Sequence, residues 1–174
     1  KLLHAATNLT IAGGNAAVVT LLLGGLLLAW IDGANKAGWG LLQHMGVGPT
    51  GNIVASVILL DLIFYGMHRA NHRISILWRF HRAHHSDLEV DVTTALRFHL
   101  GEVLISTGIK AAIIPVMGIS WTGWLVYEIV AQAVSQFQHM NVPLPDPVDS
   151  GIRRVLVTPG MHWIHHSRRR LDHD

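Results

Sequence analysis

The sequence contains no cysteine among its 174 residues. This absence excludes disulfide bonds and thiolate metal sites, so any bound metal must be held by histidine, aspartate or glutamate. Charged residues are also scarce, at 14% of the chain, whereas an average soluble protein has about a quarter. Half of the residues are apolar and the mean hydropathy is positive. This composition favours a membrane protein over a soluble enzyme.

Apolar runs are abundant, and four of them predict helices that cross a membrane. A membrane span needs about 20 mostly apolar residues. The four runs are 9–31, 52–68, 101–118 and 121–138. A short turn at Gly118 joins the last two runs, so we expect an antiparallel helical hairpin there. The sequence therefore predicts an all-α, multi-pass membrane protein with about four transmembrane helices, formed by a single integral-membrane domain over residues 1–174.

The chain begins at Lys1 instead of a methionine and stops abruptly at Asp174. We therefore expect it to be a part of a longer protein, truncated at both ends.

Histidine is common, with thirteen in the chain, and most of them fall into three clusters. The first cluster has the spacing H-x3-H, and the other two share the spacing H-x2-H-H. Residues three or four apart share one face of a helix, so each cluster should present its imidazoles in one direction. The members are His68 and His72, then His81, His84 and His85, and finally His162, His165 and His166.

These clusters predict a metal site, because neutral imidazole is the commonest metal ligand in proteins. Eight or nine imidazoles exceed the needs of one tetrahedral or octahedral ion. The sequence therefore predicts two metal ions held almost entirely by nitrogen. Imidazole suits zinc, iron, copper and nickel, so the residues alone leave the metal open.

Several polar residues interrupt the apolar runs. Asp61 lies on the same helical face as His68 and His72, where its carboxylate is suited to hydrogen-bond the second nitrogen of a metal ligand. The alternative is an acid that serves helix packing. Glu128 begins a stripe of polar residues spaced by four, which should face the interior of the bundle. Lys110 can pair with Glu128 or extend toward the membrane interface, and the sequence does not choose between them.

Other ionisable residues carry no such pattern. Asp87, Glu89 and Asp91 follow the second histidine cluster and are expected to form a solvated surface. His4 and His44 stand alone, and a lone histidine is more often an ordinary surface residue than a ligand.

The basic residues predict the orientation in the membrane. Four spans place all three histidine clusters on one side, together with the N-terminus. Eleven basic residues share that side and only Lys36 lies across the membrane, so the positive-inside rule predicts a cytoplasmic histidine face. The basic tract at the C-terminal end is better explained by this orientation than by nucleic-acid binding, and we expect no nucleic-acid partner. The eleven are Lys1, Arg69, Arg73, Arg79, Arg82, Arg97, Arg153, Arg154, Arg168, Arg169 and Arg170.

Five motifs together resemble the fatty acid hydroxylase superfamily, in particular its sterol desaturase and C-4 methyl sterol oxidase group. The motifs extend over residues 52–170. They are D-x3-Y-x2-H-R-x2-H at 61–72, W-R-x-H-R-x-H-H-S at 78–86, T-T-A-L-R-x-H at 93–99, H-x-N at 139–141 and T-P-x2-H-x2-H-H-S at 158–167.

This resemblance implies four transmembrane helices below a cytosolic cap that holds a dinuclear, histidine-rich metal centre, which we expect to contain iron, with zinc as the alternative. It implies hydroxylation or desaturation of a lipid C–H bond by O2, with electrons from a separate donor protein. Asp61, Glu102 and Asn141 become candidate hydrogen-bond partners of the ligands. The metal ligands implied by the resemblance are His68, His72, His81, His84, His85, His139, His162, His165 and His166.

The chain departs from the family pattern in two places. Leu100 stands where proline is frequent, and the Asn-Tyr-Gly element that usually follows the last cluster is missing. His99 and His173 remain candidates for additional ligands or for hydrogen-bond partners of the ligands.

Two other functions fit a histidine-rich membrane protein. One is metal binding or transport, which would place ligands near the middle of the spans and not at the helix ends. The other is zinc-dependent lipid hydrolysis, although the H-E-x2-H motif of zinc metalloproteases does not occur.

Overall fold

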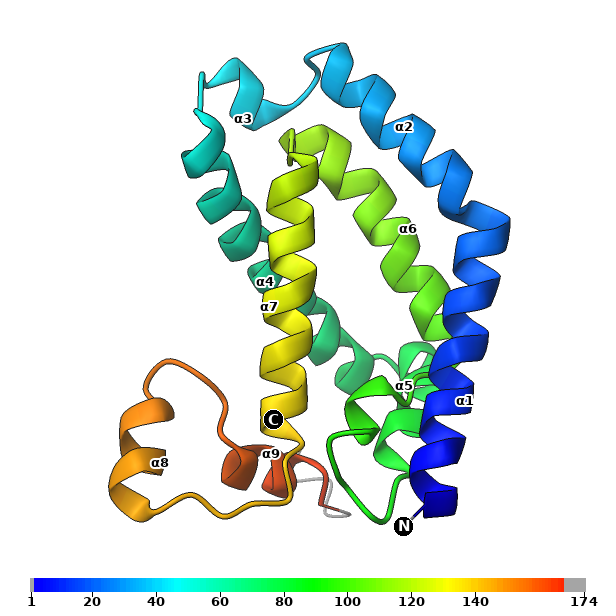
Figure 1. Ribbon diagram of the computed structural model, residues 1–174, viewed down its shortest axis with the longest axis vertical. Helices are drawn as coiled ribbons and strands as arrows, with labels where there is room; N and C mark the ends of the chain where they lie inside the picture. The colour runs from blue at the N-terminus through cyan, green and yellow to red at the C-terminus, as the bar shows by residue number, and fades with distance from the viewer. Residues whose placement is uncertain (1, 168–174) are drawn as a thin grey trace. The chain divides into compact units, whose positions relative to one another are not determined.

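A computed structural model describes residues 2–167. All secondary structure in this range is helical (Figure 1), which confirms the predicted all-α class. The α-helices are α1 (Leu2–Val19), α2 (Gly25–Lys36), α3 (Leu41–His44), α4 (Pro49–Arg73), α5 (Ser75–His85), α6 (Leu100–Met117), α7 (Trp121–Gln138), α8 (Asp146–Ile152) and α9 (Pro159–His165). A π-helical turn, η1 (Thr20–Gly24), joins α1 to α2, and a 3-10 turn, η2 (Thr94–Leu96), precedes α6.

Three helical segments within residues 2–167 are long and apolar enough to cross a membrane: Leu2–His44, Pro49–Arg73 and Leu100–Met117. They contain the first three predicted apolar runs. The fourth run forms α7, as predicted, but α7 does not join these three because its polar stripe makes it less apolar. The stripe consists of Glu128, Gln132 and Gln136.

One helix boundary differs from the sequence prediction. The first predicted span, 9–31, lies inside a longer helical run that continues from Leu2 to Lys36 through η1. The segment after His139 contains three prolines and nevertheless includes α8. Pro147 lies in the first turn of α8, where a helix does not need the missing N–H.

The chain forms two compact units, each described here by itself. The histidine unit comprises residues 2–12, 68–99 and 131–167, and the span unit comprises residues 13–67 and 100–130. All the clustered histidines belong to the histidine unit.

The predicted turn at Gly118 fixes the packing of the span unit. Gly118 has a φ of 72°, a conformation that favours glycine, and a Cβ on Gly40 would overlap the backbone of Gly118. The amide of Asn52 on α4 donates to the Gly118 carbonyl at 2.8 Å, and its Oδ1 accepts from the Ser120 N–H at 2.9 Å. The turn between α6 and α7 is therefore held by a side chain of α4.

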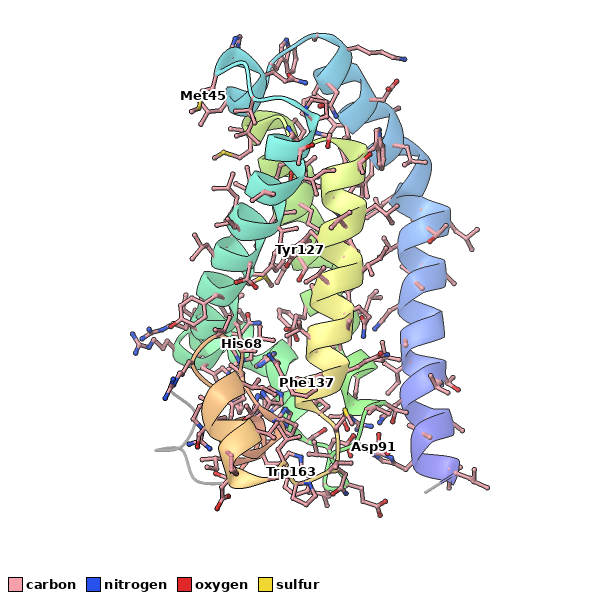
Figure 2. The ribbon with its side chains drawn as sticks, turned by 60° about the vertical axis from the view of Figure 1, so that its left-hand side comes forward. Met45, His68, Asp91, Tyr127, Phe137 and Trp163 are labelled. Carbon is pink, nitrogen blue, oxygen red and sulfur yellow. The ribbon has the colours of Figure 1, made fainter. Side chains whose placement is uncertain are left out.

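An ion pair joins α6 to α7 inside this unit. Lys110 Nζ on α6 lies 2.5 Å from Glu128 Oε1 on α7, so the structure chooses the pairing that the sequence left open. The indole of Trp124 also donates to Glu128 Oε1, at 2.7 Å. Lys110 Nζ lies 5.2 Å from the ring centroid of Phe64 on α4, and Phe64 stacks on Tyr127, which is labelled in Figure 2. The polar stripe of α7 therefore faces other helices at Glu128.

Replacing Lys110 with methionine should lower the free energy of unfolding by about 2–3 kcal/mol, because the Glu128 carboxylate then loses its charged partner and keeps only the neutral Trp124 indole. Denaturant unfolding in detergent micelles measures the change. The double variant Lys110→Met/Glu128→Gln removes both charges and should regain most of the loss. Equal stability of the single and double variants would contradict this role for the ion pair.

Candidate metal centre

The three histidine clusters lie at helix ends within the histidine unit. His68 and His72 lie in the last turns of α4, and His81, His84 and His85 end α5. His162 and His165 lie on α9, and His166 follows it directly. Pro159 occupies the first turn of α9, where its fixed φ favours helix formation. Each cluster is therefore helical, as its spacing predicts.

Nine histidines approach one another closely enough to form three groups of potential ligands. Within each group, one nitrogen from every residue lies within 4.8 Å of the others. The second and third groups share His72, so the nine divide naturally into a set of four and a set of five. The groups are His84, His139, His162 and His166; His68, His72 and His165; and His72, His81 and His85.

The set of four is built around the Nε2 atoms of its rings. His139 Nε2 lies 3.2 Å from His84 Nε2 and 3.0 Å from His162 Nε2. His166 Nε2 lies 3.1 Å from His162 Nε2. Four lone-pair positions from three separate chain segments therefore converge on one small volume.

The tautomer of His139 supports a shared cation in that volume. Its Nδ1 lies 2.7 Å from the Ser135 carbonyl oxygen, an acceptor, so Nδ1 carries the proton. The Nε2 of the neutral ring is then an unprotonated acceptor with a single lone pair. It can accept a hydrogen bond from only one of its two close neighbours, His84 and His162. A cation between the rings satisfies all three, and a backbone carbonyl on the opposite nitrogen is the usual partner of a metal-binding histidine.

The set of five surrounds His72. The ring centroid of His72 lies 4.8 Å from those of His68 and His81, 4.7 Å from that of His85 and 4.5 Å from that of His165. His68 Nε2 lies 2.9 Å from His165 Nε2, which joins the end of α4 to α9. His68 is labelled in Figure 2.

The two sets adjoin each other. The ring of His85 stacks on that of His166 with centroids 4.3 Å apart, and the ring centroids of His81 and His84 lie 5.4 Å apart. Each set draws residues from α5 and from the last histidine cluster. Neither set can therefore form unless these two distant segments of the chain come together.

Burial and mutual repulsion keep these rings neutral. Burial, followed by the neighbouring histidines, lowers the pKa values of His84, His85 and His162 far below the usual histidine range and lowers the pKa of His166 to about 3. Burial also lowers the pKa of His139, although its hydrogen bond to Ser135 opposes the shift. Neutral rings keep the lone pairs that metal binding requires.

The donor set fits transition-metal ions. Nitrogen ligands bind such ions at about 2.0–2.1 Å, which places neighbouring ligand atoms about 3.0–3.4 Å apart. The Nε2 separations of 2.9–3.2 Å lie close to that range. An all-imidazole set suits iron, zinc, copper or nickel and excludes calcium and magnesium, which prefer oxygen.

A model of the fatty acid hydroxylase family matches residues 53–173. The chain belongs to the fatty acid hydroxylase family. The match includes all nine histidines and confirms the resemblance that the motifs indicated.

Two curated relatives of this family member are lipid-modifying enzymes by name. It is 27% identical to the ornithine lipid hydroxylase OlsE of Rhizobium tropici over 67% of this chain and 34% of the relative. It is 26% identical to the human alkylglycerol monooxygenase over 64% of this chain and 24% of the relative. The chain therefore spans about a third and about a quarter of the length of these two proteins. No solved structure matches it.

The remaining predicted site residues of this hydroxylase family member lie in varied surroundings. Glu102 is buried in the first turn of α6, whereas Asp61 on α4 and Asn141 after α7 are exposed. His99 is also exposed and belongs to none of the three ligand groups. His173 lies outside the described residues. The roles of these side chains as partners of the ligands or as extra ligands remain predictions.

Asp87 and His4 lie in surroundings that differ from the sequence prediction. Asp87, expected on a solvated surface, is only 8% exposed. Burial alone would raise its pKa, but hydrogen bonds from Thr94, His4 and Asn8 lower it to about 2. His4 is not an ordinary surface residue, because its Nε2 lies 2.7 Å from Asp87 Oδ1. No local pattern indicates the contacts of Asp87 with His4 and Asn8, because these pairs are 83 and 79 residues apart in the chain.

Proposed function

We propose that this chain is the catalytic membrane part of an O2-dependent lipid hydroxylase with two metal ions, most consistent with iron. The observation that carries the proposal is the convergence of nine histidines, from three separate chain segments, into two adjoining ligand sets. Family membership supports the same chemistry.

The division into four and five assigns a ligand set to each ion. The first ion would be held by His84, His139, His162 and His166. The second would be held by members of the set around His72, namely His68, His72, His81, His85 and His165. The number of ligands exceeds what one ion accepts, which supports two ions.

The chemistry that two redox-active ions supply is the reduction of O2 and the oxidation of an unactivated C–H bond. In the overall reaction, one oxygen atom enters the C–H bond and the other leaves as water, with a pair of electrons from a separate donor protein and a pair of protons from solvent. The chain's own residues hold and orient the ions. The Ser135 carbonyl fixes the tautomer of His139, and the burial of His84 and His139 limits water at their lone pairs.

The substrate we propose is a hydrocarbon chain of a membrane lipid. The names of both relatives specify lipids with a polar head, an ornithine lipid and an alkylglycerol. The apolar helical segments of this chain give such a lipid access from the bilayer. Hydroxylation is favoured over desaturation because both relatives are named for oxygen insertion.

We further propose four spans with the histidine face toward the cytoplasm. The arrangement adds α7 to the three apolar segments. It is supported by the Lys110–Glu128 ion pair, which offsets the charges of α6 and α7 in a bilayer. The bias of basic residues toward the histidine side supports the cytoplasmic orientation.

The proposal is tested with the full chain purified into lipid nanodiscs. We expect two iron ions per chain, O2 consumption that depends on a reductant and on lipid, and incorporation of one labelled oxygen atom from ¹⁸O2 into the lipid. Metal analysis and mass spectrometry of the extracted lipids give these readouts. Active protein that contains only zinc and takes up no O2 would overturn the proposal in favour of a hydrolase.

A further inference from the structure

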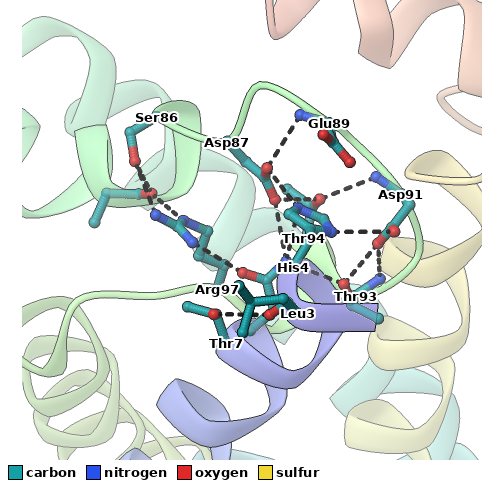
Figure 3. Close-up of polar contacts among 12 residues, drawn as sticks. Leu3, His4, Thr7, Ser86, Asp87, Glu89, Asp91, Thr93, Thr94 and Arg97 are labelled. Atoms are coloured by element: carbon teal, nitrogen blue, oxygen red, sulfur yellow. Dashed lines mark hydrogen bonds and ion pairs between the residues drawn. The ribbon is translucent and has the colours of Figure 1, made fainter. Parts of the chain in front are cut away.

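A buried polar network ties the N-terminal helix to the loop that follows the second histidine cluster (Figure 3). At its centre is Asn8 on α1, whose side chain is completely buried. Residues 2–12 and 68–99 belong to the same compact unit, so these contacts lie inside the histidine unit. The network uses no metal ligand, and the family match begins only at residue 53.

Asn8 uses both ends of its amide. Its Nδ2 donates to Asp87 Oδ2 at 3.1 Å and to Thr93 Oγ1 at 3.0 Å. Its Oδ1 accepts from Arg97 Nη1 at 2.9 Å. The single Asn8 side chain therefore hydrogen-bonds both Asp87 and Arg97, because its amide carries a donor nitrogen and an acceptor oxygen.

Arg97 carries this contact to the end of α5. Its Nε donates to the Ala83 carbonyl at 3.0 Å, and its Nη2 lies 3.4 Å from Ser86 Oγ. Ala83 and Ser86 directly flank His84 and His85 in the sequence. A cation that binds the last carbonyls of a helix also stabilises its C-terminus. The Arg97 guanidinium therefore holds the backbone directly before these two histidines and contacts the side chain directly after them.

We propose that Asn8 is a positioning residue of the metal centre, which acts through Arg97 to fix the backbone at His84 and His85. The N-terminal helix is then part of the machinery that holds the ligands and not only a membrane span. The inference rests on the proposed function in one respect, namely that His84 and His85 are ligands.

The physical reason is the dependence of ligand geometry on the backbone that carries it. Without the Asn8 amide, Asp87 loses one buried donor and Arg97 loses one buried acceptor. Unpaired buried polar groups are costly, so both side chains would move toward other partners or water. Arg97 then no longer holds the Ala83 carbonyl in place, and the backbone and imidazole rings of His84 and His85 become more mobile.

The first measurement is hydrogen–deuterium exchange of the metal-free full chain in nanodiscs. In Asn8→Ala, amides in 83–86 and 94–97 should exchange about 10-fold faster than in the wild type, because local opening becomes easier. Thr10→Ala is the matched control, because Thr10 is exposed on the same helix and bonds only the Ala6 carbonyl. Unchanged exchange at 83–86 in Asn8→Ala would overturn the inference, whether or not the protein binds metal.

The second measurement is the rate at which a chelator removes iron from the loaded protein. Asn8→Ala should lose metal about 10-fold faster, in the lower part of the range found for residues that support metal ligands, and Thr10→Ala should not. A wild type that holds no metal would contradict the proposed function alone, since the exchange measurement stands without it.

A double-mutant cycle separates positioning from general stability. If Asn8 acts through Arg97, adding Asn8→Ala to Arg97→Leu should change exchange at 83–86 and metal loss by less than twofold. Additive effects in the cycle would show that Asn8 only stabilises the fold and would overturn the proposal.

Discussion

Replacing His84 with alanine should remove one of the two metal ions and reduce lipid hydroxylation at least about 100-fold, because even residues that only support a metal ligand are worth 10–100-fold. His84 is 2% exposed, and its Nε2 lies 3.2 Å from that of His139. Its ring also stacks on Phe98, with centroids 4.9 Å apart and planes 2° apart. The ring is thus fixed from one side while its Nε2 faces the other ligands.

The readouts are metal content per chain and comparative lipidomics of cells that express the wild type or His84→Ala. His44→Ala is the matched control, because His44 is exposed at the end of α3 and belongs to the span unit. It should retain both metals and full product formation. His84→Gln provides a second variant that keeps a polar side chain and avoids most of the cavity, so a folding defect can be recognised. A His84→Gln protein with two metals and wild-type product would contradict the assigned role.

The metal-free protein should lose stability steeply as the pH falls below 6.5. The pKa values of His84, His85, His162 and His166 are lowered in the folded state, to about 3 for His166 and far below the usual histidine range for the others. Above pH 6.5 the rings are neutral in both states, and the stability is complete. Below it the unfolded chain binds protons that the folded chain excludes, so stability falls until the pH reaches the folded pKa.

The size of this effect is set by the number of rings that share it. Each such histidine contributes about 1.4 kcal/mol of destabilisation by about pH 5.5, one unit below its unfolded pKa. Four of them together reach about 5–6 kcal/mol, comparable with the whole stability of many domains. Bound metal opposes the change, because it binds only the neutral rings of the folded state.

Thermal melts of the metal-free and metal-loaded protein at several pH values between 7.5 and 5 measure this dependence. The metal-free melting temperature should fall sharply over this range and the metal-loaded one much less. His85→Gln, which removes one of the four rings, should show a shallower fall. A metal-free melting temperature that stays constant down to pH 5 would contradict the proposed linkage.

The helices were predictable because their signals are local. The runs at 52–68, 101–118 and 121–138 match α4, α6 and α7 closely, and the turn at Gly118 lies where the sequence placed it. Histidine spacing likewise predicted helical clusters, since three- and four-residue steps have a fixed geometry on a helix. The H-x2-H-H spacing occurs twice, and the predicted topology places all three clusters on one side of the membrane. These two observations predicted that the clusters come together.

The polar network around Asn8 was not predictable in the same way. Asn8 lies directly before the apolar run 9–31 and belongs to no motif, and Asp87 lies in an acidic stretch that resembles a surface loop. Their burial depends on how a distant helix packs, which no spacing rule describes. The pairing of Lys110 with Glu128 was partly predictable. The sequence indicated both residues as possible partners but could not determine the side-chain rotamers that bring them together.

The division of both ligand sets between distant parts of the chain has a consequence for biosynthesis. His165 follows His85 by about 80 residues, which takes a ribosome about 4–16 s to add. During that interval the nascent chain carries five imidazoles in His68–His85 but lacks the residues that complete either set. Incomplete nitrogen sites favour copper and zinc over iron. We therefore expect the metal supply near the translating ribosome to influence which ions the finished protein binds.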